Sequence, residues 1–233
     1  MFRSNPPSTL YRGVAAGKLL GFLFAVLLAG LSSVEARDPN LYVFLCFGQS
    51  NMEGFPGIEA QDQGPVDERF RVLAAVDFPA QGRRAGEWYP AIPPLCRPST
   101  GIGPADYFGR TLVAKLPNRI KVGVVNVSVA GSRIEVFDKE TCQAYAATAP
   151  DWMKNTINAY GGNPYARLVE LGKQAQKDGV IKGILLHQGE SNSGDKDWPG
   201  KIKHIYSNLL KDLDLKPEDV PLLAGELVNA DQQ

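Results

Sequence analysis

The sequence lacks the charge imbalance and the repeated segments that would assign it to several common classes of protein. Lysine plus arginine and aspartate plus glutamate number 25 each among 233 residues, so the formal net charge is zero. A basic excess is the usual sign of a nucleic-acid-binding domain, and its absence predicts no nucleic acid partner. With 44% hydrophobic and 21% charged residues, the composition is typical of a soluble globular protein.

Cysteine and histidine are also scarce. The three cysteines are Cys46, Cys96 and Cys142, and the two histidines are His187 and His204. No spacing among them resembles a zinc site, so we expect no metal. Cys46 lies in an apolar run and is expected to be a small buried hydrophobe. Whether Cys96 and Cys142 form a disulfide stays open, because the sequence does not give their separation.

The N-terminal segment has the pattern of a secretory signal. Basic residues (Arg3, Arg12 and Lys18) precede an uncharged apolar stretch over residues 19–34, and Val34-Glu35-Ala36 has small residues at the positions that a signal peptidase requires. We therefore predict a signal peptide over residues 1–36 and a secreted or periplasmic protein. An uncleaved anchor is the alternative, and only then would the protein be held at a membrane. Residues 37–233 are long enough for one domain.

Four apolar runs are predicted to form buried strands. They cover Tyr42–Phe47, Lys121–Val127, Ile181–His187 and Val220–Leu227. Each run is continuous rather than alternating, which is typical of a parallel sheet with both faces covered. The segment Phe70–Val76 is expected to form a small hairpin.

Helical patterns lie between the later strands. Proline at the first position predicts helices over Pro104–Leu116 and Pro164–Asp178, the second one capped by Asn163. A third helix begins near Trp198 and carries an apolar stripe. Strands alternating with helices predict an α/β fold, a three-layer α/β/α domain of the flavodoxin-like type with a parallel sheet. We expect the segments 90–103 and 138–162 to be long, irregular loops.

Three polar turns follow three of the predicted strands. They are Gly48-Gln49-Ser50-Asn51, the segment Asn126–Ser132 and the segment His187–Asn192. Parallel strands end at the same edge of a sheet, where open α/β sheets bind ligands. We therefore expect the three turns to converge on one site.

The residue types in these turns suit acyl transfer. A serine hydroxyl at Ser50 can act as the nucleophile. The backbone N–H groups of Gly131 and Ser50 and the side-chain amide of Gln188 can stabilise the oxyanion that forms. Glu190 adds a carboxylate beside Gln188.

Each of these residues also has a structural interpretation. Gly131 can be an ordinary turn glycine, Gln188 a hydrogen-bonded strand end, and Glu190 a residue that orients loop backbone. His187 ends an apolar run and is expected to be structural, and His204 is expected at the edge of a solvated helix face. The pair Gly101 and Gly103 resembles a phosphate-binding loop only weakly, because it has no third glycine and follows no strand.

The motifs Gly48-Gln49-Ser50-Asn51-Met52 and His187-Gln188-Gly189-Glu190-Ser191, with the Gly131 turn between them, resemble the SGNH hydrolase superfamily. The closest resemblance is to its sialate O-acetylesterase and carbohydrate esterase family 6 (acetylxylan esterase) branch. It covers roughly residues 40–229 and implies hydrolysis of acetyl esters on sugars without a metal or organic cofactor.

The resemblance also assigns roles to individual residues. It implies Ser50 as nucleophile, Ser50, Gly131 and Gln188 as oxyanion donors, and Glu190 as a supporting carboxylate. Members of the family take their general base from an Asp-x-x-His element near the C-terminus. This sequence has no such element, and the residue three before His204 is Lys201. We therefore expect residues 37–233 to be a C-terminally incomplete esterase domain.

The sequence leaves two candidate functions. The first is a carbohydrate O-acetylesterase that works through a serine acyl-enzyme, and the alternative is a non-catalytic carbohydrate-binding protein on the same fold. A nucleotide or phosphate binder would need a glycine-rich loop after the first strand, and Gly48-Gln49-Ser50-Asn51 is too short and polar for that. The identity of the acetylated sugar and the oligomeric state stay open.

Overall fold

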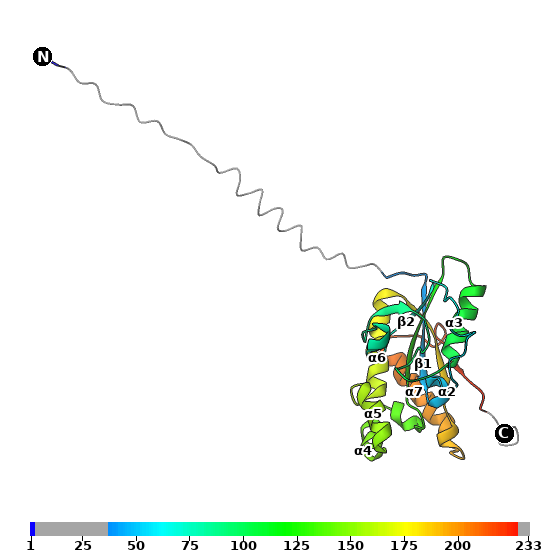
Figure 1. Cartoon of the computed structure of the whole chain (residues 1–233). Helices are drawn as coiled ribbons and strands as arrows, with labels where there is room; N and C mark the ends of the chain where they lie inside the picture. The colour runs from blue at the N-terminus through cyan, green and yellow to red at the C-terminus, as the bar shows by residue number, and fades with distance from the viewer. Residues whose placement is uncertain (3–36, 228–233) are drawn as a thin grey trace. The chain divides into compact units, whose positions relative to one another are not determined.

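A six-stranded sheet forms the centre of the fold (Figure 1). The computed structural model describes residues 1–2 and 37–227, so the predicted signal peptide lies almost entirely outside the described residues. The strand order is β3-β2-β4-β1-β5-β6. Within the described residues, no helix has the length and apolar character needed to cross a membrane.

The central strand β1, Leu41–Gly48, pairs in parallel with β4, Lys121–Ser128, and with β5, Val180–His187. In this register Gly48 lies opposite both Ser128 and His187. The three strands therefore end side by side, and the predicted convergence of their turns is confirmed.

The outer strands are short. β2, Phe70–Leu73, runs parallel to β4, and β6, Leu222–Ala224, runs parallel to β5. β3, Trp88–Pro90, pairs antiparallel with β2 and forms one edge. The prediction of a hairpin within Phe70–Val76 was wrong. The antiparallel partner of β2 is β3, which lies outside that segment, and β2 also pairs with β4 in the main sheet.

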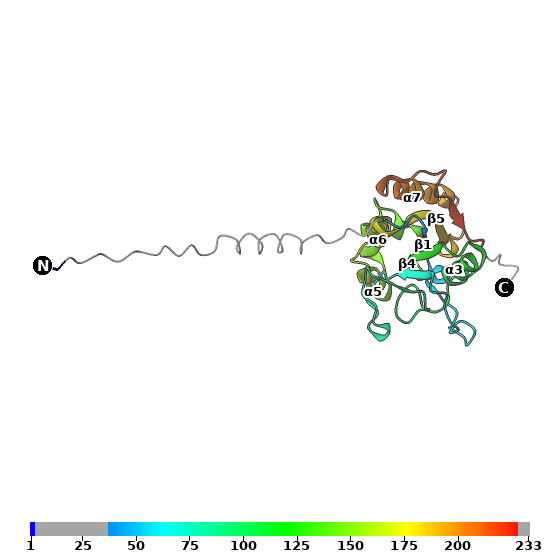
Figure 2. The ribbon, with the colours of Figure 1, turned by 90° about the horizontal axis from the view of Figure 1, so that it is seen from above.

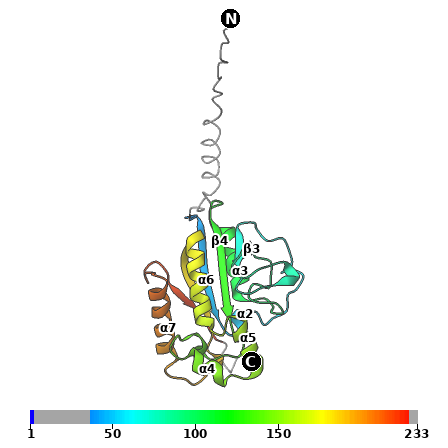
Figure 3. The same cartoon turned by 90° about the vertical axis from the view of Figure 1, so that its left-hand side faces the viewer.

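Helices cover both faces of the sheet, which confirms the predicted α/β/α arrangement. α6, Pro164–Asp178, and α7, Trp198–Asp212, pack in one hydrophobic core. α3, Pro104–Lys115, packs in a second core on the opposite face (Figures 2 and 3).

Alternating side chains of β1 supply the two cores. Val43, Leu45 and Phe47 point into the α6 core, whereas Phe44 and Cys46 point into the α3 core. A strand buried on both faces needs this continuous apolar sequence.

Local sequence signals set the helix ends. Asn163 caps α6 by accepting a hydrogen bond from the Ala166 N–H at 2.9 Å, and Pro164 follows at the first helical position. Short helices complete the fold: α2, Ser50–Glu53; η1, Pro79–Gln81; η2, Ile134–Phe137; α4, Cys142–Thr148; α5, Asp151–Ala159; and η3, Glu190–Asn192.

One further expectation needs correction, and one open question is answered. The segment 138–162 contains α4 and α5 rather than an irregular loop. Cys96 and Cys142 are both buried free thiols, so they do not form a disulfide. The Cys96 sulfur lies 3.3 Å from the Tyr160 hydroxyl instead.

Candidate active site

Ser50 lies directly beyond the carboxyl end of the central strand. It is the first residue of α2 and is partly exposed. Within the described residues its hydroxyl makes no hydrogen bond, and the N–H at the start of a helix has no partner inside the helix. A Cβ on Gly48 would lie 2.1 Å from the His187 carbonyl oxygen, so only glycine lets the first and third turns approach this closely.

Gln49 joins the first turn to the third. Its side-chain carbonyl lies within hydrogen-bonding distance of the N–H groups of Gly189 and Ser191, at 3.4 and 3.2 Å. The same oxygen accepts a hydrogen bond from the Gln188 side chain at 3.3 Å. The sequence pattern indicated no role for Gln49, yet this buried carboxamide holds the turn after β5 against Ser50.

The second turn is joined to the third in the same way. The Ser191 hydroxyl donates to the Gly131 carbonyl at 3.0 Å, and Gln188 Nε2 lies 3.2 Å from the Ser132 carbonyl. Gly131 has a left-handed φ of 65°. Its N–H has no acceptor within the described residues. Three turns that are far apart in the sequence therefore form one hydrogen-bonded unit.

The Gln188 side chain is only 1% exposed and is hydrogen bonded at both ends. Its carbonyl oxygen accepts from the Trp198 indole N–H at 2.6 Å. One N–H hydrogen donates to the Asn192 side chain at 2.7 Å, while the other has only the two longer contacts with Gln49 and Ser132. One hydrogen is thus held firmly and the other weakly.

Glu190 lies beside the residue that follows the serine. Its Oε1 accepts a hydrogen bond from Asn51 Nδ2 at 2.6 Å and is 3.7 Å from His187 Nδ1. His187 Nδ1 is buried without a hydrogen-bond partner in the described part of the chain. Neither His187 nor His204 makes a hydrogen bond with Ser50 among the described residues.

An ion pair of low exposure contacts the second turn at Ala130. Glu53, the last residue of α2, pairs with Arg97, and the same carboxylate lies 3.4 Å from the Ala130 N–H. Burial and the nearby Glu53 carboxylate raise the pKa of the Cys96 thiol to about 12. This thiol therefore stays protonated at neutral pH.

Asn192 is another positioning residue that the sequence pattern did not reveal. Its side-chain carbonyl accepts the Ile134 N–H at 2.8 Å, and its amide donates to Asp195 at 3.2 Å. Lys201 completes the cluster with a 2.7 Å hydrogen bond to Asp195. Hydrogen bonds from Lys201 and then Asn192 lower the pKa of Asp195 to about 2.

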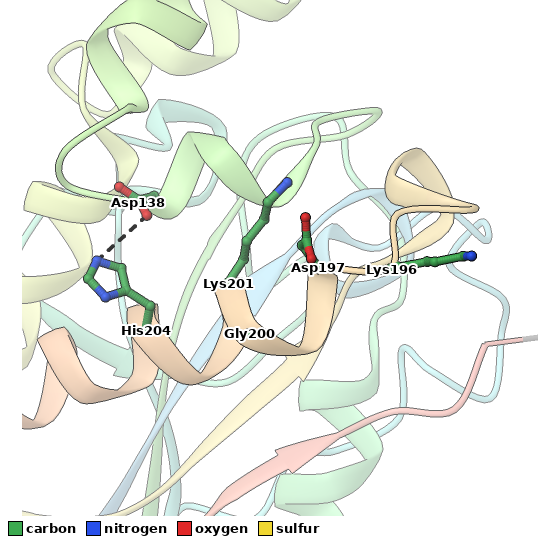
Figure 4. Close-up of a pocket in the computed structure, with 6 residues that line it drawn as sticks. All are labelled: Asp138, Lys196, Asp197, Gly200, Lys201 and His204. Atoms are coloured by element: carbon green, nitrogen blue, oxygen red, sulfur yellow. Dashed lines mark ion pairs between the residues drawn. The ribbon is translucent and has the colours of Figure 1, made fainter.

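His204 lies away from the three turns around Ser50. It lines a cavity of about 400 Å³ formed mainly by α7 and the Asp138 turn (Figure 4). Its imidazole faces Asp138 and forms a 3.1 Å hydrogen bond with Glu140. None of the predicted catalytic or oxyanion residues lines this cavity.

Asp138, Glu140 and His204 are also the side chains that could hold a cation. One donor atom from each lies within 4.8 Å of the others, and the described residues contain no second group of this kind. Glu140 and His204 are more than half exposed and already bond to each other. The cluster shares no residue with the three turns around Ser50.

The glycines at 101 and 103 allow close packing of backbone. A Cβ on Gly101 would lie 1.7 Å from the Pro56 carbonyl oxygen, and one on Gly103 would lie 2.7 Å from the Met52 carbonyl oxygen. The two glycines allow close contact with α2 and with the segment that follows it, which explains their presence without a bound phosphate.

The fold and the turns at its sheet edge define the class of protein: an SGNH-like α/β fold with a serine at the end of its central strand. The family of carbohydrate esterases described as sialic acid-specific acetylesterases matches residues 40–233, and the chain belongs to this family.

Solved structures share the fold. A protein from Arabidopsis thaliana is 19% identical with a TM-score of 0.58, over 84% of this chain and 90% of the other. A carbohydrate acetylesterase from Xanthomonas citri is 21% identical with a TM-score of 0.52, over 82% of this chain and 43% of the other. NanS is 20% identical with a TM-score of 0.57, over 81% of this chain and 68% of the other.

Proposed function

We propose that this protein is a carbohydrate O-acetylesterase that forms an acetyl-enzyme on Ser50. The observation that carries the proposal is the hydrogen-bonded unit of three turns. It combines a hydroxyl at Ser50 and a backbone N–H at Gly131 that have no hydrogen-bond partner within residues 37–227, and family membership supplies the substrate class.

The chemistry has two steps. The Ser50 hydroxyl oxygen attacks the acetyl carbonyl carbon while a general base takes its proton. The ester bond then breaks, and the sugar oxygen leaves as an alcohol after receiving that proton. Water attacks the acetyl-serine in the second step and releases acetate, which restores the hydroxyl.

The negative charge of each tetrahedral intermediate needs fixed donors. We assign this role to the N–H groups of Ser50 and Gly131 and to the more weakly held side-chain hydrogen of Gln188. The shorter bond to Asn192 fixes the planar carboxamide, and the second hydrogen, which has only long contacts, is left to donate to the oxyanion. Removing one donor of this kind typically raises the barrier by about 2.7–4 kcal/mol.

Glu190 is proposed to support the site through its charge. It fixes Asn51 next to the nucleophile. Its carboxylate can also stabilise the positive charge of a histidine that acts as the general base and takes the Ser50 proton. The resemblance assigns the general base to an Asp-x-x-His element, which this sequence does not contain. We therefore propose that adding a C-terminal segment that carries such an element raises the rate by orders of magnitude.

The substrate is proposed to be an acetyl ester of sialic acid or of a related sugar. The acetylxylan esterase branch is the alternative within the same chemistry. Acetate release from O-acetylated sialic acid and from acetylated xylan, compared at equal ester concentration, separates the two. A higher kcat/KM on xylan would favour the second branch.

Ser50→Ala is the matched test of the mechanism, because it removes one oxygen at a partly exposed position. The variant should lose acetate release and keep the wild-type unfolding midpoint. Equal rates for the variant and the wild type would exclude Ser50 as the nucleophile.

A non-catalytic carbohydrate-binding protein is the second candidate. It is favoured by one observation: no histidine within the described residues hydrogen bonds to Ser50. Binding of an O-acetylated sugar without acetate release would select this function.

A further inference from the structure

One exposed aromatic side chain contacts the proposed oxyanion turn. Trp152 lies in the first turn of α5 and is 55% exposed. A Cβ placed on Gly131 would lie only 2.8 Å from Trp152 Cη2. The six-membered ring of the indole therefore occupies the space that a side chain at position 131 would fill.

The three tryptophans differ in how their indole N–H groups are used. Trp88 donates to Asp178 at 2.8 Å and Trp198 donates to Gln188 at 2.6 Å. The Trp152 N–H has no acceptor within the described residues. Among the described residues, Trp152 thus combines an exposed ring with an unused donor, whereas Trp88 and Trp198 each donate to a side chain.

The contact between Trp152 and the turn rests on a rigid support. The next residue, Met153, and Ile157 are buried in the core and fix α5. The Tyr145 hydroxyl of α4 accepts the Arg133 N–H at 3.0 Å and lies 3.6 Å from the Met153 sulfur. These contacts fix the backbone of α5, which carries the indole, beside the Gly131 turn.

The chemistry of the ester places a sugar at this position. In the proposed function the acetyl oxygen points at the Gly131 N–H, and the sugar is attached to the same carbonyl carbon through one oxygen. A sugar ring has apolar C–H faces and hydroxyl groups at its rim. An exposed indole offers an apolar face together with one donor, so it matches both features.

We propose that Trp152 is the platform that binds the sugar ring of the substrate, by stacking of the indole and a hydrogen bond from its N–H to a sugar hydroxyl. The inference rests on the proposed esterase function and adds a residue that distinguishes sugar acetates from simple acetates. Burial of the exposed part of the indole by the sugar supplies the binding energy.

Kinetics with two substrates test the proposal. For Trp152→Ala, kcat/KM on O-acetylated sialic acid should fall by about tenfold, mainly through KM, since a tenfold change corresponds to a modest binding contribution. Hydrolysis of ethyl acetate, which has no ring to stack, should stay within about twofold of the wild type. Trp152→Phe keeps a ring and should lose less than Trp152→Ala.

Tyr107→Ala is the matched control, because Tyr107 is a similarly exposed aromatic residue on α3. It should leave the ratio of the two kcat/KM values unchanged. Equal losses on both substrates for Trp152→Ala would overturn the proposal. A selective loss in Phe55→Ala instead would also overturn it, since Phe55 is an aromatic residue that is more exposed than Trp152.

A binding measurement separates this proposal from the esterase function. In a Ser50→Ala background, titration with O-acetylated sialic acid should change the tryptophan fluorescence, and Trp152→Phe should abolish the change. A fluorescence change in the Ser50→Ala variant, together with no acetate release by the wild-type protein, would support the platform and reject the esterase. Acetate release with unaltered binding in Trp152→Phe and Trp152→Ala would reject the platform alone.

Discussion

Replacing Gly131 with alanine should destabilise the protein for two separable reasons. The left-handed φ of 65° costs a residue with a Cβ about 1–2 kcal/mol. The new methyl group would also lie 2.8 Å from Trp152 Cη2, and overpacking of this kind costs about 1–3 kcal/mol. The sum predicts that Gly131→Ala lowers the free energy of unfolding by about 2–5 kcal/mol.

A double-mutant cycle with Trp152→Ala separates the two contributions. Removal of the indole leaves room for the methyl group but does not change the backbone angle. In the Trp152→Ala background the cost of Gly131→Ala should therefore fall to about 1–2 kcal/mol. Urea unfolding followed by circular dichroism measures all four proteins, and Trp152→Ala alone serves as the reference.

The outcome that would refute the reasoning is a cost of Gly131→Ala that is the same in both backgrounds. The indole would then not occupy the space beside Gly131, and the sugar platform would lose its structural basis. A cost near zero in the wild type would show that the turn relaxes freely and that Gly131 is not held at a left-handed angle.

Other residues of the site and the N-terminal segment can be tested separately. Gln49→Met should lower the free energy of unfolding by about 1–3 kcal/mol, because it removes the acceptor of two backbone N–H groups. The rate of acetate release should fall as well. Wild-type stability in urea would contradict the role given to Gln49. Asp195 has a pKa lowered from 3.8 to about 2, so its stabilising contribution is present above pH 3.8 and is lost as the pH falls toward 2; the difference between wild-type and Asp195→Asn unfolding midpoints should shrink over that interval, and a constant difference would argue against the Lys201 hydrogen bond. Expression with the N-terminal segment should yield an exported protein that begins at Arg37, which mass spectrometry of the exported fraction checks; an intact N-terminus in that fraction would favour the anchor.

The sequence predicted the central part of the fold because its signals are local. The continuous apolar runs of β1, β4 and β5 are typical of strands covered on both faces, and the pair Asn163-Pro164 marked the start of α6. Since parallel strands share one edge, the convergence of the turns at Ser50, Gly131 and Gln188 could also be predicted.

The remaining features depend on contacts between distant residues. Gln49 meets Gln188, and Glu53 meets Arg97, across long stretches of sequence, so local patterns do not reveal these pairs. Nothing in the local pattern around Trp152 indicates that its ring lies against Gly131. The short helices α4 and α5 were missed because their segment begins and ends with loop-forming residues and each helix is brief.

The most direct test of the central claim is a search for an acetyl group on Ser50. The protein is mixed with p-nitrophenyl acetate, quenched in acid within the first turnovers, digested and analysed by peptide mass spectrometry. The account predicts a single acetyl group on the peptide that contains Ser50, and none in the Ser50→Ala variant. Release of p-nitrophenol at the same rate by both proteins, with no acetyl group on Ser50, would contradict it.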